Sequence, residues 1–212
     1  MNVTDLIPFV RTIINEASTE KDTFSEEVDA ALRDFLRVAM RQIASMPAYM
    51  GKPVSMSEAS AASWEQRPDG MYVATIKCGN DFLRPVSVQL ADWVRPVFRF
   101  MPAETGLFLS QYSSALGIGN GPKSPVAFLV KDPDTRIIAH SSQEQGTYTL
   151  RYIPVPEIGP DGTLDIPDVY RDVLAFTTAG LYQQSINEYD AAKASFDTAA
   201  SLLQLINNES QE

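Results

Sequence analysis

The stretch from 81 to 100, DFLRPVSVQLADWVRPVFRF, constrains the fold more than any other part of the chain. Its first half predicts a β-strand with one buried face, because Val86, Val88 and Leu90 alternate with polar residues. After a break at 91–93, its second half predicts another extended run with the same period. One side of that run carries Val94, Pro96, Phe98 and Phe100, and the other carries Arg95, Val97 and Arg99.

Arginine and proline give this stretch a second property. Arg84, Arg95 and Arg99 lie on or beside the predicted strands of an otherwise acidic protein. Pro85 and Pro96 cannot donate a hydrogen bond to a β-ladder, so they indicate an edge, a bulge or a strand start. Edge strands of this kind are either protected against pairing or suited to meet a partner. We therefore expect the three arginines to contact an acidic neighbouring subunit.

The overall charge restricts the partners that the chain can have. The sequence holds 27 acidic and 17 basic residues, a net charge of −10. An acidic surface repels phosphate and argues against tight nucleic-acid binding. The same charge suits a protein that surrounds DNA and lets it pass without specific binding.

The sequence predicts a protein that is soluble and cytoplasmic at synthesis. Its N-terminus lacks the basic start and cleavage site of a signal peptide, and no apolar run approaches the roughly 18 residues of a membrane span. Cys78 is the single cysteine, which excludes an intramolecular disulfide and a multi-cysteine metal site.

Two amphipathic helices are predicted at the N-terminal end, over 4–17 with Thr4 as the N-cap, and from Thr23 or Ser25 to about Met46. On the second helix, arginines four residues apart form a stripe on the face away from the apolar residues: Arg33, Arg37 and Arg41. This stripe is a solvated face or, alternatively, a contact surface for an acidic partner.

The middle of the chain predicts a β region. A connector with a possible short helix at 57–64 leads into it, and the predicted strands cover 71–77, 126–130, 136–140 and 147–153 as well as the stretch 81–100. The segment GIGNGP at 117–122 leads through proline into a strand, whereas a phosphate-binding loop opens a helix. We expect a loop tip there, within an irregular stretch at 101–121 to which we assign no role.

Two further helices are predicted near the C-terminus, from Asp165 or Asp168 to about Gln184 and from the cap Asn187 to about Ile206. A polar tail follows from 207, and its Asn207 and Asn208 are candidate partner contacts. The helix pair resembles a single tetratricopeptide-type hairpin at Gly180, Tyr182, Tyr189, Ala192, Phe196 and Ala199. One such repeat cannot bury its own apolar face, which favours a hairpin that packs on the N-terminal helices.

Residues that could carry chemistry are sparse. His140 is the single histidine, and neither it nor Cys78 has the sequence context of a catalytic or metal site. No serine lies in a nucleophile elbow, and no calcium-binding loop is present. We expect no enzymatic activity, no cofactor and no metal. A hydrolase whose carboxylates are far apart in the sequence is the open alternative.

These elements predict an α+β fold in which a bundle of N- and C-terminal helices holds an inserted antiparallel β domain. The expected boundaries are 1–64 for the N-terminal helical part, 65–160 for the β domain and 161–212 for the C-terminal hairpin with its tail.

Three segments resemble the head-to-tail adaptor proteins of tailed bacteriophages, which are also called connector, ring or head completion proteins. DLIPFVRTIINE and SEEVDAALRDFLRVAMRQI resemble their two opening helices. DFLRPVSVQLADWVRPV, with the later GNGPKSPVAFLV and YTLRYIPVP, resembles the β insertion of adaptors from gut-type phages. The third segment is the C-terminal hairpin at 170–206.

The resemblance implies a structural virion protein at the neck, or portal vertex. Such a protein forms a homo-oligomeric ring of about twelve copies under the portal protein, around a DNA channel. Its β insertion faces outward or toward the next tail or ring protein, and its C-terminal tail orders against the portal. The resemblance implies no catalysis and no cofactor. An interaction module that uses the tetratricopeptide-like hairpin is the alternative function.

Overall fold

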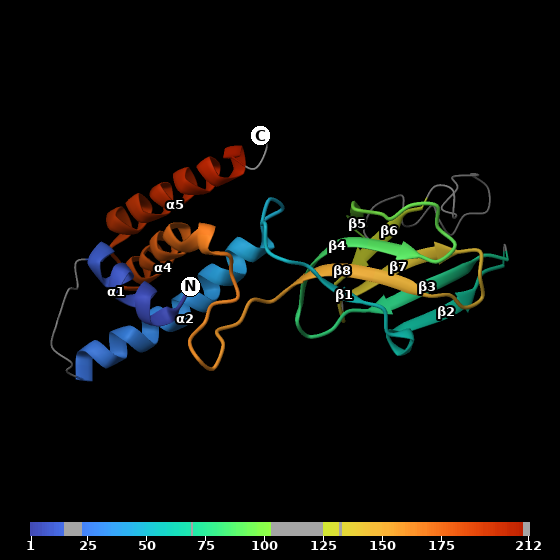
Figure 1. The fold of residues 1–212 in the computed structure, drawn as a ribbon, viewed down its shortest axis with the longest axis horizontal. Coiled ribbons are helices and arrows are strands. Elements are labelled where there is room, and N and C mark those ends of the chain that lie inside the picture. The colour runs from blue at the N-terminus through green and yellow to red at the C-terminus, as the bar shows by residue number, and fades with distance from the viewer. Residues whose placement is uncertain (15–22, 69, 103–124, 132, 210–212) are drawn as a thin grey trace. The chain divides into compact units, whose positions relative to one another are not determined.

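The computed structural model describes residues 1–14, 23–68, 70–102, 125–131 and 133–209 (Figure 1). The fold class is α+β, as predicted, with helices from both ends of the chain and β-sheets from its middle. The chain divides into a helical unit, Met1–Gly51 with Val155–Glu212, and a β unit, Lys52–Pro154. The β unit begins before the predicted position 65, because residues 54–56 and 62–66 are already strands of its sheets.

The helical unit encloses one core with helices from both ends of the chain. Its elements are α1 (Val3–Ile13), α2 (Thr23–Ser45), a short 3-10 helix (Asp168–Tyr170), α4 (Arg171–Ser185) and α5 (Tyr189–Glu209). Side chains with no exposed surface come from three of these helices: Leu6 and Val10 from α1, Leu32, Leu36 and Met40 from α2, and Leu174 from α4. The two ends therefore close a common apolar interior.

The start of α1 is fixed by Asn2 and not by Thr4. The Asn2 Oδ1 atom accepts a hydrogen bond from the Thr4 backbone N–H at 3.0 Å, which satisfies a free donor of the first turn. The same residue ties α1 to the C-terminal half, because its Nδ2 donates to the Asp161 carbonyl at 3.1 Å. Beside it, the Val3 N–H donates to the Gly162 carbonyl at 3.0 Å.

Helices α4 and α5 form a close hairpin. Gly180 on α4 permits this approach, because a Cβ atom there would lie 2.7 Å from the ring of Phe196 on α5. A buried hydrogen bond from the Ser195 hydroxyl to Gln183 Oε1, 2.8 Å long, also joins the two helices. The turn between them contains Asn187 in the left-handed conformation, with φ 65°.

The β unit packs two sheets around a second core. One sheet has the order β1-β8-β4 and the other β2-β3-β7-β6-β5. The strands are β1 (Val54–Met56), β2 (Ala62–Gln66), β3 (Tyr72–Lys77), β4 (Phe82–Leu90), β5 (Phe100–Pro102), β6 (Ala127–Val130), β7 (Arg136–Ser141) and β8 (Tyr148–Pro154). The core between the sheets includes Ile76, Val88, Leu90, Ile137 and Leu150.

The strands predicted at 71–77, 126–130, 136–140 and 147–153 and in the first half of 81–100 are present, and the start of the region differs from the prediction. Residues 54–56 and 62–66 form strands where a connector and a short helix at 57–64 were expected, and only Ala59–Ala61 is helical there, as one 3-10 turn. Strand β5 pairs with β6 in parallel, whereas the other strand pairs are antiparallel. The inserted domain is therefore a mixed β sandwich.

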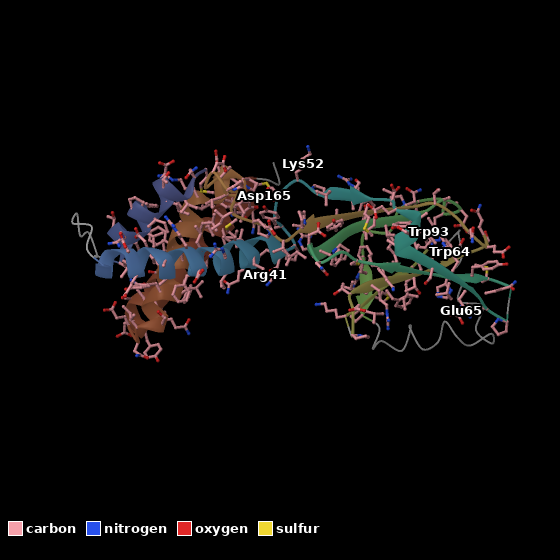
Figure 2. All side chains as sticks on the ribbon, turned by 90° about the horizontal axis from the view of Figure 1, so that it is seen from below. Arg41, Lys52, Trp64, Glu65, Trp93 and Asp165 are labelled. Atoms are coloured by element: carbon pink, nitrogen blue, oxygen red, sulfur yellow. The ribbon has the colours of Figure 1, made fainter. Side chains whose placement is uncertain are left out.

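The second half of the stretch 81–100 does not form the single strand that its alternation predicted. Trp93 is 4% exposed and its indole N–H donates to the His140 carbonyl at 2.7 Å (Figure 2 labels Trp93). Val97 is also buried and forms one bridge to Val88 of β4, before the chain joins the other sheet at Phe100. Because Trp93 and Val97 fill the core, Val94 and Phe98 are left 69% and 67% exposed.

The contact between Gly180 and Phe196 predicts the effect of a small substitution. Gly180→Ala should destabilise the protein by about 1 to 2 kcal/mol, because displacing the Phe196 ring costs more than the roughly 1 kcal/mol gained in helix propensity. Thermal and denaturant unfolding measure this difference. In the Phe196→Leu background the same change should cost less, and a Gly180→Ala protein of higher stability than the original contradicts the packing described here.

Candidate interaction surface

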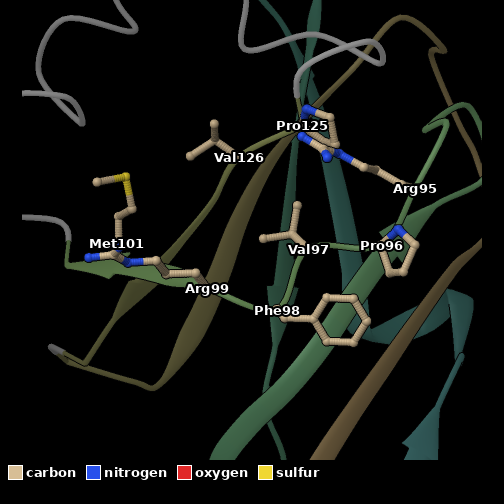
Figure 3. A pocket seen from close by; sticks show the side chains of 8 residues that line it. All are labelled: Arg95, Pro96, Val97, Phe98, Arg99, Met101, Pro125 and Val126. Atoms are coloured by element: carbon tan, nitrogen blue, oxygen red, sulfur yellow. The ribbon is translucent and has the colours of Figure 1, made fainter.

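A groove on the β unit gathers two of the predicted contact residues (Figure 3). Its volume is about 440 Å³, and its lining consists of Arg95, Pro96, Val97, Phe98, Arg99, Met101, Pro125 and Val126. The lining is apolar apart from the two guanidinium groups. We refer to these eight residues as the arginine groove.

The anchoring of Val97 explains how the groove is built. The Val97 N–H donates to the Val88 carbonyl at 2.8 Å, and the Val88 N–H donates back to the Val97 carbonyl at 3.0 Å. This double hydrogen bond holds Val97 against the core. Its neighbour Phe98 remains at the surface, between Arg95 and Arg99 in sequence, and both arginines are exposed.

The two arginines of the groove lack a partner within the part of the chain that the structure describes. No carboxylate there forms a salt bridge with Arg95 or Arg99. Exposed cations beside an exposed aromatic ring are a composition found at protein–protein interfaces, where arginine and aromatic residues are enriched. The arrangement can bind an acidic, partly apolar surface.

The remaining predicted contact residues are distributed over other places. Arg84 is half-buried on β4 and does not line the groove. Arg33, Arg37 and Arg41 are exposed on α2, as expected for the stripe, and Arg37 forms a salt bridge with Asp34 of the same helix. A second hollow, of about 430 Å³, joins Arg37 and Arg41 to Val155, Pro156, Glu157 and Ile158 (Figure 2 labels Arg41).

The first two residues of the predicted polar tail are helical. Asn207 and Asn208 belong to helix α5, which runs to Glu209. The expectation that a tail at 207 leaves the helix is therefore wrong for these two residues. Residues 210–212, and the glycine-rich segment at 117–122 with most of the stretch 101–121, lie outside the described residues.

Sequence reasoning missed a second exposed surface, at the turn between α4 and α5. Ile186 is 43% exposed and Tyr189 is 63% exposed, and the acidic residues Glu188 and Asp190 on either side of the tyrosine are exposed as well. We refer to these four residues as the acidic corner. The sequence pattern that could have indicated this surface is an aromatic residue between two acidic residues, directly after the helix cap Asn187.

Charge is divided unequally between the two units. The helical unit carries 18 acidic and 7 basic residues, a formal charge of −11. The β unit carries 9 acidic and 10 basic residues, a formal charge of +1. All of the excess negative charge therefore belongs to the helical unit, and the arginine groove belongs to the unit that lacks it.

The side chains that could take part in catalysis or metal binding make hydrogen bonds within the β unit. His140 is 1% exposed, its Nδ1 lies 3.0 Å from Arg67 Nη1, and its carbonyl accepts the Trp93 indole hydrogen bond. The Tyr152 hydroxyl donates to Asp81 at 2.7 Å, and burial together with this hydrogen bond raises the pKa of Tyr152 to about 12. Among the described residues, no group of three or more His, Cys, Asp or Glu is placed to hold a metal ion.

Neither a protein-family model nor a curated protein sequence matches this chain. Of the helices in the described ranges, none is long and apolar enough to cross a membrane.

The half-buried thiol of Cys78 should be inert. Burial raises the pKa of Cys78 from 9.0 to about 12, and the thiolate is the reactive form. At pH 8 we expect Cys78 to react with an aromatic disulfide reagent at least about tenfold more slowly in the folded than in the unfolded protein. Release of the coloured thiol measures both rates. Equal rates contradict the burial of this side chain.

The same shift gives the sign of a pH effect. The pKa of the thiol is higher in the folded protein than in the unfolded chain, where it keeps its ordinary value. The contribution of this thiol to the free energy of unfolding is therefore fully present below pH 9, and it declines as the pH rises toward 12.

Proposed function

We propose that this chain is a structural virion protein of a tailed bacteriophage, a head-to-tail adaptor. In this proposal it forms a ring between the portal protein and the next tail or ring protein, around a central DNA channel. The observation that carries the proposal is the insertion of a β unit with an exposed arginine groove into a helical unit that both chain ends complete. The order of these elements agrees with the resemblance found in the sequence.

The charge distribution supports a channel. A wall that lines passing DNA must not hold its phosphates, and the helical unit has a formal charge of −11. Helices packed side by side in a ring therefore present a repulsive surface to DNA. The β unit, with a formal charge of +1, is the unit suited to contacts with acidic proteins.

The alternative function, a module that binds partners through the tetratricopeptide-like hairpin, has less support. The face of α4 that such a hairpin would offer is covered by α1 and α2, because Leu174, Ala175 and Ala179 are fully buried in the common core. The hydrolase alternative likewise lacks an observation in its favour. Three hollows formed by the described residues bring together no pair of carboxylates: the arginine groove and the hollow beside Trp64 have none in their linings, and the hollow at Arg41 has only Glu157.

Mixing the protein with the portal protein of the same phage tests the proposal. We expect a ring that migrates with the portal in size-exclusion chromatography and is visible by negative-stain electron microscopy. Arg95→Glu and Arg99→Glu should leave the monomer folded, because both side chains are exposed, and should weaken assembly.

Arg151→Glu is the matched control. Arg151 is an exposed arginine of the same unit, on β8, and does not line the groove. A wild-type protein that stays monomeric and ignores the portal contradicts the proposed function. Unfolding of the Arg95 or Arg99 variant would show instead that this surface belongs to the core.

A further inference from the structure

We propose that the arginine groove of one copy receives the acidic corner of a second copy. This inference deepens the proposed function and rests on it for the closed ring. It commits to one occupant of the groove: the turn between α4 and α5, with Ile186, Glu188, Tyr189 and Asp190.

The groove offers two positive charges and an aromatic surface. Arg95 and Arg99 are exposed and make no salt bridge within the described ranges, and Phe98 between them is 67% exposed. Beyond the phenylalanine, Val97, Met101 and Val126 give the groove an apolar lining (Figure 3). An occupant that matches this surface must bring acidic groups on either side of an apolar or aromatic side chain.

The acidic corner has this composition. Glu188 and Asp190 are exposed on either side of Tyr189, and Ile186 adds a further exposed apolar side chain. Neither acid forms a salt bridge within the described part of the chain. Acids also stabilise the start of a helix such as α5, which accounts for the two charges. It does not account for the exposure of 63% of the tyrosine between them.

Hydrogen bonds within the turn order the backbone and the tyrosine of the corner. Asn187 adopts the left-handed conformation that ends α4, and its Oδ1 accepts a hydrogen bond from the Tyr189 hydroxyl at 2.9 Å. The backbone N–H of Glu188 donates to the Gln183 carbonyl at 2.9 Å. A preorganised surface loses less conformational entropy on binding than a flexible one.

The two surfaces differ from each other and lie on different units of the chain. A contact between them is therefore heterologous, and every copy can use its groove toward one neighbour and its corner toward the next. Such contacts generate a ring when the rotation closes. The strong negative charge of −11 on the helical unit also disfavours contacts between two helical units more than contacts with the β unit, whose formal charge is +1.

Exchanging one pair of charges tests the contact. Arg99→Glu and Asp190→Arg, each alone, should weaken self-association about tenfold or more, because each places like charges opposite one another. A chain with both changes should recover association, since every interface again joins opposite charges. Sedimentation velocity over a range of concentrations, at about 50 and 500 mM salt, measures all four proteins.

Two variants with matched chemistry serve as controls. Arg151→Glu changes an exposed arginine of the β unit outside the groove, and Asp197→Arg changes an exposed acid of α5 two turns from the corner. Both should associate as the wild type does. Circular dichroism and thermal unfolding establish that each variant is folded.

Several results would overturn the inference. These are a wild-type protein that stays monomeric at every concentration, an Arg99→Glu protein that associates normally, and a double variant that does not recover. A loss confined to portal binding would assign the groove to the portal and leave the proposed function in place. Ring assembly that is lost in the single variants and recovered in the double variant would support this contact. If these rings did not bind the portal, the result would contradict the adaptor function.

Discussion

The closure of one helical core by both ends of the chain is the constraint on which the other features depend. The N-terminal residues are fastened to the C-terminal half by the Val3–Gly162 and Leu164–Met1 backbone hydrogen bonds, 3.0 and 3.1 Å long. The terminal amine also lies 2.8 Å from Asp168. Behind these contacts, fully buried side chains from α1, α2 and α4 each contribute about 1.5 to 3 kcal/mol of hydrophobic stabilisation. Neither end has a complete core without the other.

This closure makes the β unit an insertion with its own interior. Its two sheets enclose Ile76, Leu90 and Leu150, which belong to a cluster separate from the helical core. The surface of the β unit can therefore carry charged and exposed aromatic residues without a cost to the helices. The arginine groove is a feature of this kind, since it exposes Phe98 beside two arginines that form no salt bridge with the described residues.

Much of the helical unit could be predicted from the sequence. The apolar spacing predicted the helices found as α1, α2, α4 and α5, and the start at Thr23 agrees with α2. The cap of α1 was misplaced at Thr4, because the contact of Asn2 with Asp161 is a tertiary feature that no local pattern reveals. Helix α5 continues through Asn207 and Asn208, although the composition there indicated a tail.

The β unit was less predictable at its edges and at the candidate site. Alternation at 94–100 predicted one strand, whereas the chain crosses there from β4 to the other sheet. The buried residues between 93 and 99 are Trp93 and Val97, which are four positions apart, whereas a strand with one buried face buries every second residue. The arginines at 95 and 99 were identified, but the groove depends on Pro125 and Val126, which are distant in sequence. The acidic corner is a surface, and periodicity indicates mainly what is buried.

Electron cryomicroscopy of the intact phage particle would locate this chain and its contacts. We expect a closed ring of this chain directly under the portal, with acidic helices around an open channel and the arginine groove of each copy against the acidic corner of its neighbour. Particles that lack this chain at the neck, or a ring whose copies contact each other through different surfaces, would contradict it.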